Sequence, residues 1–537
     1  MRNENTRVDL HVHSSASQLS KLGIQRSLAL PECATHPTEV YELAKRRGMD
    51  FVTLTDHDTI TGALALADLP DTFISEELTA SFRGEPQAVH VLCYGITADD
   101  HEWLQAHSDD VETCAEYLHS NGITAALAHP FYAVAAPLTP RHRRRLAELF
   151  PIWETRNGSR AKELNLPAFV YIETHGGTPI GGSDDHAGID IGRTYTETPP
   201  AATPQEFLGH VRAGHTTTAG DQGSAAKWTH AALALAIRSL RGLPAGQPDP
   251  QRVLQIVMRV LAEGEARRGP VAGDLGPADA QALLDAWLNA LELHCDGPEL
   301  LRLLASGEIS HAALHRRARL VHERRLSCAV RGLAGALGQP GSFDLGGHAL
   351  ALFNACMPAI PYAASGAFLG SEKRKVSGEP DQLRVALVAD GLDAMHGVSA
   401  AVRQIRERGV LGFEVEVIGT DRSVDHRLSA VAEIDAPFYP GLRLGVPGLP
   451  AVVSALAEGR YDLVHVCTPG PAGILAGLIA HTMGQALISS YHTELASYAG
   501  VRSGRAELEF LVSAGLRMFY GACECVLSPS PASDERL

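Results

Sequence analysis

The stretch Asp9-Leu10-His11-Val12-His13-Ser14 (DLHVHS) ends the first apolar run of the chain. Side chains two residues apart on a strand face the same side, so His11 and His13 project together. Two parallel imidazoles are suited to hold one metal ion, because histidine is the commonest metal ligand in proteins. An HxH pair does not by itself identify a metal site, so its weight depends on the rest of the chain.

Comparable polar residues end the later apolar runs. The expected strands are Val8–His11, Phe51–Thr55, Val89–Tyr94, Ala125–Ala128, Ile152–Glu154 and Thr178–Gly182. They alternate with helix-like stretches, which favours a parallel α/β sheet, open or closed. Near their ends lie Asp56, His57, Glu76, Glu77, His90, His129, Asp184 and His186. Active sites of βα barrels lie at the carboxyl ends of the strands. Mixed imidazole and carboxylate sets suit zinc, iron or manganese, so we expect divalent metal ions there.

The ordered segments DLHVHS, TDHD, EELT with VHVLCYG, AHPF, ETRNG and GGSDDH resemble the PHP (polymerase and histidinol phosphatase) family over roughly residues 6–215. The resemblance implies a distorted (βα)7 barrel, spanning residues 1–215, with two or three metal ions that hydrolyse phosphoesters. It assigns one ion to His11, His13, Glu77 and Asp184. It assigns a second to Glu77, His90 and His129, and a third to His57 and His186. Glu77 is preferred to Glu76 because Leu78 and Thr79 follow it, as in the family.

The chain departs from the family at the third site. The family's additional Asp or His falls near Ser17 and Gln18, and Gln18 is a poor ligand. Either this site is weak, or Glu32 or His36 takes that position. The resemblance also places Asn157 near the site. His57 or His186, if free of metal, is a candidate general acid. The candidates for binding substrate phosphate are Arg156, Arg160 and Arg193.

Residues 216–370 are expected to be mostly helical and 371–382 to form a linker. From Leu345 to Ser371 the chain has no Asp, Glu, Lys or Arg. Glycine, proline and asparagine interrupt this stretch, so a buried helical hairpin is the first interpretation. Docking of 345–371 on a membrane surface and a spanning segment are the alternatives.

A second α/β pattern covers residues 383–537 and predicts a Rossmann-like sheet. The turn at His396-Gly397-Val398, the segment CTPGPAGILAG (467–477) and the segment SSYHTELASY (489–498) resemble the N-terminal half of family-four GT-B glycosyltransferases. The resemblance implies that Gly397 lies near donor phosphates and His492 near the reacting sugar. The chain reaches Leu537 soon after the expected strand at Val526–Ser528, so we expect the donor half to be missing. A sugar nucleotide is then a partner only if a second half is supplied.

Composition limits the function classes. The chain has 537 residues and a formal net charge of −16, which disfavours broad nucleic-acid binding. Nine cysteines without a CxxC pair indicate reduced thiols. The N-terminus has no apolar segment typical of a signal peptide. We therefore expect a cytoplasmic protein, peripheral to the membrane if 345–371 docks there.

Three functions remain open. The first is metal-dependent hydrolysis of a small phosphomonoester or nucleotide by the barrel, which is fused to an incomplete glycosyltransferase. The second is a protein of glycosyltransferase lineage, in which the barrel is regulatory or structural and sugar transfer needs the missing half. The third is a non-catalytic scaffold that the metal site stabilises.

Overall fold

The computed structural model describes residues 5–17, 31–241, 277–337, 344–376, 382–393, 397–436, 441–492, 494–504 and 506–534. The chain forms two compact units. The first comprises Met1–Gly246, Pro270–Gln281 and Asp296–His311, and the second comprises Gln247–Gly269, Ala282–Cys295 and Ala312–Leu537. The helical stretch 216–370 does not stand apart in this division, because its helices are shared between the two units.

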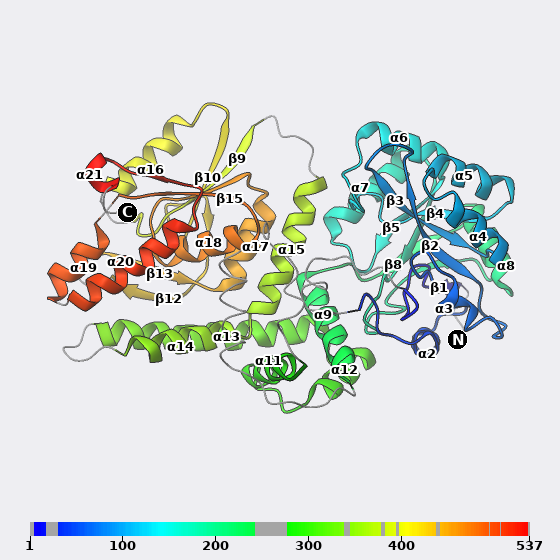
Figure 1. The fold of residues 1–537 in the computed structure, drawn as a ribbon, viewed down its shortest axis with the longest axis horizontal. Coiled ribbons are helices and arrows are strands. Elements are labelled where there is room, and N and C mark those ends of the chain that lie inside the picture. Colours follow the sequence, from blue (N-terminus) through cyan, green and yellow to red (C-terminus); the bar gives the residue numbers. More distant parts are fainter. Residues whose placement is uncertain are drawn as a thin grey trace. The chain divides into compact units, whose positions relative to one another are not determined.

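The first unit contains a five-stranded sheet in the order β2-β3-β4-β5-β6, of which Figure 1 labels β2 to β5. Its strands are β2 (Ser75–Ser81), β3 (Ala88–Tyr94), β4 (Thr124–Leu127), β5 (Ile152–Asn157) and β6 (Thr178–Gly182). Strand β3 runs antiparallel to both of its neighbours, whereas β4, β5 and β6 are parallel. The sheet is therefore mixed. Strands β2 and β3 are antiparallel because a short hairpin turn joins them, whereas a parallel pair would need a longer crossover.

Two irregular segments, residues 9–13 and 51–57, join the edges of this sheet. Residues 9–13 bond to the chain beyond β6, where the Asp184 amide donates to the His11 carbonyl at 2.6 Å. The Thr55 amide donates to Val12 at 2.9 Å, and the Glu77 amide donates to Asp56 at 3.2 Å. Together with β2–β6, these segments make a closed ring of seven, which confirms the distorted barrel. The regular strand expected at Phe51–Thr55 is wrong, since only isolated bridges form there.

Helices and a small sheet surround this barrel. The helices are α2 (Pro37–Arg46), α3 (Thr61–Leu64), α4 (Ala98–Ala106), α5 (Val111–Ser120), α6 (Pro140–Leu149), α7 (Lys162–His175), α8 (Pro204–Arg212), α9 (Ala225–Leu240) and α12 (Gly297–Ser306). Strands β1 (Thr6–Val8), β7 (Thr194–Thr198) and β8 (Thr217–Gly220) form an antiparallel sheet. Buried apolar side chains such as Leu78, Val91 and Trp153 pack with Leu104 and Leu118 of the helices, so the helical shell fixes the strands.

The second unit contains a six-stranded parallel sheet in the order β11-β10-β9-β14-β15-β16. Its strands are β9 (Leu383–Val388), β10 (Phe413–Gly419), β11 (His426–Arg427), β14 (Leu463–Val466), β15 (Ala486–Ser490) and β16 (Cys525–Leu527). This order reverses between β9 and β14, as in doubly wound sheets, and confirms the Rossmann-like prediction. A separate hairpin pairs β12 (Ala430–Asp435) with β13 (Arg443–Pro447).

The remaining helices are α11 (Pro277–Ala290), α13 (His311–Leu337), α14 (Leu345–Cys356), α15 (Ile360–Val376), α16 (Gly397–Arg408), α17 (Leu449–Gly459), α18 (Pro471–Thr482), α19 (Leu495–Ser503), α20 (Ala506–Gly521) and α21 (Pro531–Asp534). Helix α15 includes the first part of the expected linker 371–382, and residues 377–381 lie outside the described residues. Within the described chain, no single helix has the length and apolar character to cross a membrane. The bent pair Gly346–Cys356 and Ile360–Arg374 meets that test only jointly, with a 60° angle.

Candidate metal centre

Histidines and carboxylates from the carboxyl ends of the barrel segments converge on one site. His11 and His13 follow β1, His129 follows β4, and Asp184 and His186 follow β6. His90 lies near the start of β3, opposite Thr79. Since β3 runs antiparallel to β2, its first residues lie beside the end of β2, and this direction brings His90 to the site.

The alternation of strand side chains separates the two neighbouring glutamates. Glu77 is fully buried within the histidine cluster, with His11 Nε2 at 3.1 Å from its Oε2 atom. Glu76 faces α4 instead, where its Oε2 contacts His101 Nδ1 at 2.7 Å and accepts from Gln105 Nε2 at 2.9 Å. Successive side chains of a strand point to opposite faces, so only one of the two glutamates can reach the site.

The first group consists of His11, His13, Glu77 and Asp184. Oε2 of Glu77 lies 3.1 and 3.2 Å from Nε2 of His11 and of His13. Oδ1 of Asp184 lies 3.6 and 3.5 Å from the same two nitrogens. The corners of a tetrahedron with arms of about 2.0–2.1 Å are about 3.3 Å apart. Each carboxylate oxygen thus lies near the same two imidazole nitrogens, and His11, His13 and Glu77 place their donor atoms close enough together to hold one cation.

The second group uses the other oxygen of Glu77. Oε1 of Glu77 lies 2.7 Å from Nδ1 of His90 and 3.1 Å from Nε2 of His129. One carboxylate thus presents each of its oxygens to a different set of imidazoles. This is the arrangement needed for a carboxylate that bridges two ions.

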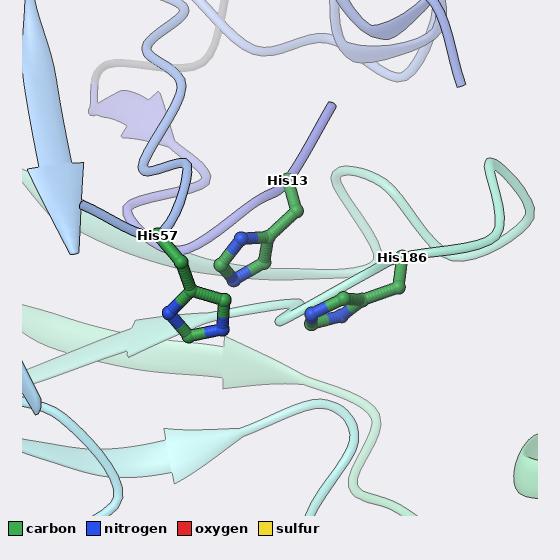
Figure 2. Close-up of side chains that lie close together, drawn as sticks. All are labelled: His13, His57 and His186. Atoms are coloured by element: carbon green, nitrogen blue, oxygen red, sulfur yellow. The ribbon is translucent and has the colours of Figure 1, made fainter. Parts of the chain in front are cut away.

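The third group is His13, His57 and His186, whose rings point toward a common space in Figure 2. Glu32 joins it, with Oε1 at 3.2 Å from Nε2 of His57 and 3.7 Å from Nε2 of His186. Of the two substitutes considered for Gln18, the structure brings Glu32 to the site. His36 instead caps α2 through Thr38 and is exposed. Gln18 itself lies outside the described residues.

The donor atoms of these groups lack ordinary hydrogen-bond partners. Among the described residues, buried nitrogens without a hydrogen bond of good geometry include both ring nitrogens of His13 and Nδ1 of His57, His90 and His129, although His13, His57 and His90 each place one such nitrogen within 3.2 Å of a Glu77 oxygen. The Oε2 atom of Glu32 is also buried without a partner. Buried polar atoms are nearly always paired, and unpaired ones indicate an ion or water that satisfies them. The residues present therefore fit divalent cations.

The electrostatics of the cluster favour a cation. Burial opposes charge on His13, but the nearby carboxylates of Asp184 and Glu77 outweigh it and raise the pKa of His13 to about 9. Burial likewise opposes ionisation of Glu77, yet the neighbouring histidines hold its pKa well below the usual value. The neighbouring carboxylates thus favour the protonated forms of His11 and His13, whereas burial lowers the pKa of His57 and lowers that of His129 to about 4. A metal ion would displace these protons.

Glu154 holds the first group from behind and was missed by sequence reasoning. Its Oε1 lies 3.0 Å from Nδ1 of His11, and its Oε2 accepts from the His129 amide at 2.8 Å and from Asn157 Nδ2 at 3.0 Å. Asn157 also donates to Oδ2 of Asp184 at 3.1 Å. A carboxylate behind a histidine ligand fixes the ring's tautomer. The sequence feature that could have predicted this role is the glutamate at the start of ETRNG, which stands in an expected buried strand.

Backbone strain also concentrates at this site. His129 and Asp184 have φ values of 27° and 50°, and Asp58 next to His57 has 53°. Non-glycine residues rarely adopt this left-handed region, which costs about 1–3 kcal/mol each. Such strain persists where the surroundings fix the side chain, and it is common at functional sites.

One of the three candidate arginines reaches the cluster. Arg160 places Nη2 at 3.4 Å from Asp184 Oδ2, and its guanidinium lies 3.9 Å from the ring centre of Tyr132. Arg156 instead donates to the Gly220 carbonyl at 2.7 Å. Arg193 donates to the Leu304 carbonyl at 3.0 Å and pairs with Asp190. The geometry therefore retains Arg160 alone as a phosphate-binding candidate.

In the second unit, Asp390, which follows β9, binds the first amides of α18. The buried Asp390 carboxylate accepts from the amides of Ala472 and Gly473 at 2.9 and 3.0 Å, so it occupies the N-terminus of α18. Gly397 is the exposed first residue of α16, and His492 is exposed after β15. Residues 394–396, before Gly397, lie outside the described residues.

Comparison with known proteins identifies the C-terminal segment. Residues 398–537 match the model of Glycosyltransferase Family 4, so this part of the chain carries a domain of that family, as predicted. A GDP-mannose-dependent alpha-mannosyltransferase of Corynebacterium glutamicum is 27% identical over 172 residues, 29% of this chain and 40% of that protein. An uncharacterised protein of Methanocaldococcus jannaschii is 31% identical over 75 residues, 14% of this chain and 42% of that protein. The chain spans about two fifths of each relative.

Solved structures show only distant likeness. PsfC from Pseudomonas syringae has a TM-score of 0.31 at 16% identity, covering 44% of this chain and 99% of its own. An amidohydrolase from Chromobacterium violaceum has a TM-score of 0.25 at 18% identity, and the match covers 33% of this chain and 87% of that protein. A protein from Bifidobacterium adolescentis, described as a metal-dependent phosphoesterase, has a TM-score of 0.23 at 15% identity. The match covers 37% of this chain and 91% of that protein. Scores this low carry no argument about function.

Proposed function

We propose that the first unit is a metal-dependent phosphoesterase that hydrolyses a small phosphomonoester or a nucleotide. The observation that carries this proposal is the position of Glu77, whose two oxygens each contact a different set of buried imidazoles. Buried, unpaired ring nitrogens around the same carboxylate support it. Paired metal sites of this kind are suited to in-line displacement at phosphorus.

Three sets of residues would hold the ions. On the pairwise contacts, these are His11, His13, Glu77 and Asp184 for the first, Glu77, His90 and His129 for the second, and His57, His186 and Glu32 for the third. Bound divalent ions would supply positive charge that polarises the phosphoryl group and favours deprotonation of an attacking water. Manganese, zinc and iron all suit these donors.

The chain's own side chains would bind and orient the substrate. Arg160 has donors that match phosphate oxygens in pairs, and Tyr132 supports its guanidinium plane. Asn157 acts as a positioning residue, because its amide binds Glu154 and Asp184 and its oxygen accepts from the Arg160 amide at 2.9 Å. Asn157 therefore links the first metal group to the phosphate-binding segment.

The geometry favours a ligand role over a general-acid role for His57 and His186. Nδ1 of His186 lies 3.0 Å from the Asp184 carbonyl oxygen, which can only accept. Nδ1 therefore carries the ring proton, and Nε2 keeps its lone pair for a metal. Nε2 of both histidines faces Glu32 Oε1.

A phosphatase assay tests the proposal. We expect the chain loaded with Mn²⁺, Zn²⁺ or Fe²⁺ to hydrolyse p-nitrophenyl phosphate or a nucleoside monophosphate. Glu77→Gln should lose bound metal and turnover together. Glu76→Gln should keep both, since Glu76 lies on the opposite face of β2. A metal-loaded wild type without turnover on any of these substrates, or an active Glu77→Gln variant, would exclude this function.

For the second unit we propose a part in glycosyl transfer, which the family match at residues 398–537 favours. Gly397 and His492 would then face donor phosphates and the reacting sugar. GDP-mannose is the first donor to test, because one relative is named for it. Calorimetric titration with GDP-mannose tests this role: binding that His492→Ala weakens would support it, and binding that His492→Ala leaves unchanged would exclude His492. If GDP-mannose and other sugar nucleotides fail to bind, the proposal for the second unit is refuted.

A further inference from the structure

Lys227 lies in the first turn of α9, and its side chain is buried although it carries a charge. Its Nζ atom donates to the carbonyl oxygen of Gly158 at 2.9 Å. The same atom lies 3.4 Å from Oδ2 of Asp190. Lysine is almost never fully buried unless its charge is paired, so its contacts explain its position. One ammonium group therefore joins two separate segments of the first unit.

The first of these segments carries Arg160, the candidate for binding substrate phosphate. The Ser159 carbonyl accepts from Trp228 Nε1 at 2.6 Å, and the Arg160 carbonyl accepts from the Gly223 amide at 2.8 Å. Together with the Gly158 carbonyl, three consecutive acceptors are thus held by residues 223–228. The backbone of Arg160 therefore takes its position from the start of α9.

The second segment is the loop that follows β6 and carries two of the proposed metal ligands. Within it, the carboxylate of Asp185 accepts from four successive amides, those of residues 187–190, at 2.5–3.2 Å. Oδ1 of Asp190 also lies 2.9 Å from Nε2 of His311 and 3.3 Å from Nε of Arg193. Asp190 is therefore fixed to the metal-ligand loop by contacts that do not involve Lys227.

The contacts of Lys227 exceed what is needed to neutralise Asp190. Arg193 and His311 already lie beside that carboxylate, on its other oxygen. The contact of Lys227 with the Gly158 carbonyl is shorter than its contact with Asp190, by 2.9 Å against 3.4 Å. Lys227 therefore uses Asp190 as an anchor and holds the segment of Arg160 against it.

We propose that Lys227 is a positioning residue of the phosphoesterase site, which fixes the segment of Arg160 relative to the metal-ligand loop. Asn157 fixes the same segment from the barrel side, because its oxygen accepts from the Arg160 amide and its amide donates to Asp184. The guanidinium of Arg160 thus stays beside Asp184, where it can meet a phosphoryl oxygen. The inference rests on the proposed phosphoesterase function and adds α9 to its site.

Lys227→Met tests the proposal, since methionine keeps most of the side-chain length and removes the charge and its donors. We expect the variant to fold with wild-type metal content, because Asp190 keeps Arg193 and His311. The KM for p-nitrophenyl phosphate should rise about tenfold or more with kcat nearly unchanged, as when a charged hydrogen bond to substrate is lost. The dissociation constant of inorganic phosphate, measured by calorimetry without turnover, should rise by a similar factor.

A second variant and a control accompany this measurement. Trp228→Phe keeps an aromatic ring and removes only the donor to the Ser159 carbonyl, so it should weaken phosphate binding in the same direction without removing a buried charge. Lys162→Met is the matched control, because Lys162 is an exposed lysine two residues after Arg160. It should keep the wild-type KM and phosphate affinity.

The outcomes separate this inference from the function on which it rests. A metal-loaded wild type that neither hydrolyses the substrates nor binds phosphate excludes the phosphoesterase, and this inference with it. An active wild type whose Lys227→Met and Trp228→Phe variants keep the wild-type phosphate affinity overturns the positioning role alone. Equal weakening by Lys162→Met, or a Lys227→Met variant that loses metal and kcat at unchanged KM, would also overturn it.

Discussion

Replacing Glu154 by glutamine tests how the first metal group is held. Oε2 of Glu154 accepts from two donors, the His129 amide and Asn157 Nδ2. The amide group of a glutamine would therefore keep its oxygen at that position, because its NH₂ group cannot face two donors. The NH₂ group would then occupy the position of Oε1, 3.0 Å from Nδ1 of His11.

This change would place the proton of His11 on the wrong nitrogen. Nδ1 would have to accept from the new NH₂ group, so the ring proton would move to Nε2. That atom lies 3.1 Å from Glu77 and 3.6 Å from Asp184 and is the proposed ligand atom. Loss of such a partner typically weakens metal binding 10–100-fold, which is about 1.4–2.7 kcal/mol.

The assay is competition between the protein and a fluorescent chelator for Zn²⁺ or Mn²⁺. Glu76→Gln is the matched control, since it makes the same chemical change in a buried glutamate that faces α4. We expect Glu154→Gln to lose affinity while Glu76→Gln keeps it. Equal affinity in Glu154→Gln and wild type, with both folded by circular dichroism, would refute the tautomer argument.

Three other substitutions address the third site, the barrel packing and the second unit. Glu32→Gln should lower the metal content by one ion per chain, measured by plasma mass spectrometry, and unchanged content would remove Glu32 from the site. Gly182→Ala would push a methyl group into the backbone of His11, so urea denaturation should show a free energy of unfolding lower by about 1–3 kcal/mol or more. Gly209→Ala is the control, because its methyl group meets no atom within 4 Å and should not destabilise the chain. Burial raises the pKa of Asp390 from 3.8 to about 6, so the folded chain binds more protons than the unfolded chain in that range. Stability should therefore fall by ~3 kcal/mol as pH rises through this window. Asp390→Asn should lack this fall, and an identical pH profile would contradict it.

Local sequence pattern was enough to bring out the histidine cluster. The i, i+2 spacing of His11 and His13 survives in the structure because residues 9–13 bond to extended chain on both sides. The choice of Glu77 over Glu76 was made on the residues that follow Glu77, as in the resembling family, and strand alternation in the structure places Glu77 within the histidine cluster and Glu76 on the opposite face. The irregular segment at Phe51–Thr55 was not predictable from apolar content, because its shape follows from closing the ring.

The sequence pattern does not predict which residues distant in the chain contact each other. Arg156, Arg160 and Arg193 look alike in the sequence, but only the fold decides that Arg160 meets Asp184 while Arg193 binds the Leu304 carbonyl. Strands β7 and β8 were missed because threonine-rich segments lack a clear apolar run.

Glu32 shows how a fold can supply a donor that its expected position lacks. A metal site requires donor atoms that are close in space, whatever their positions in the sequence. The segment before α2 places the buried carboxylate of Glu32 at 3.2 Å from His57 Nε2. Burying a charge without a partner is costly, so the carboxylate of Glu32 is stable there only beside cationic neighbours. His57 and His186 supply that charge when protonated, and their hydrogen bonds hold the pKa of Glu32 below its ordinary value despite burial. A divalent ion would supply the same charge without protons, which is why this donor set fits a third ion even though its sequence position is unusual.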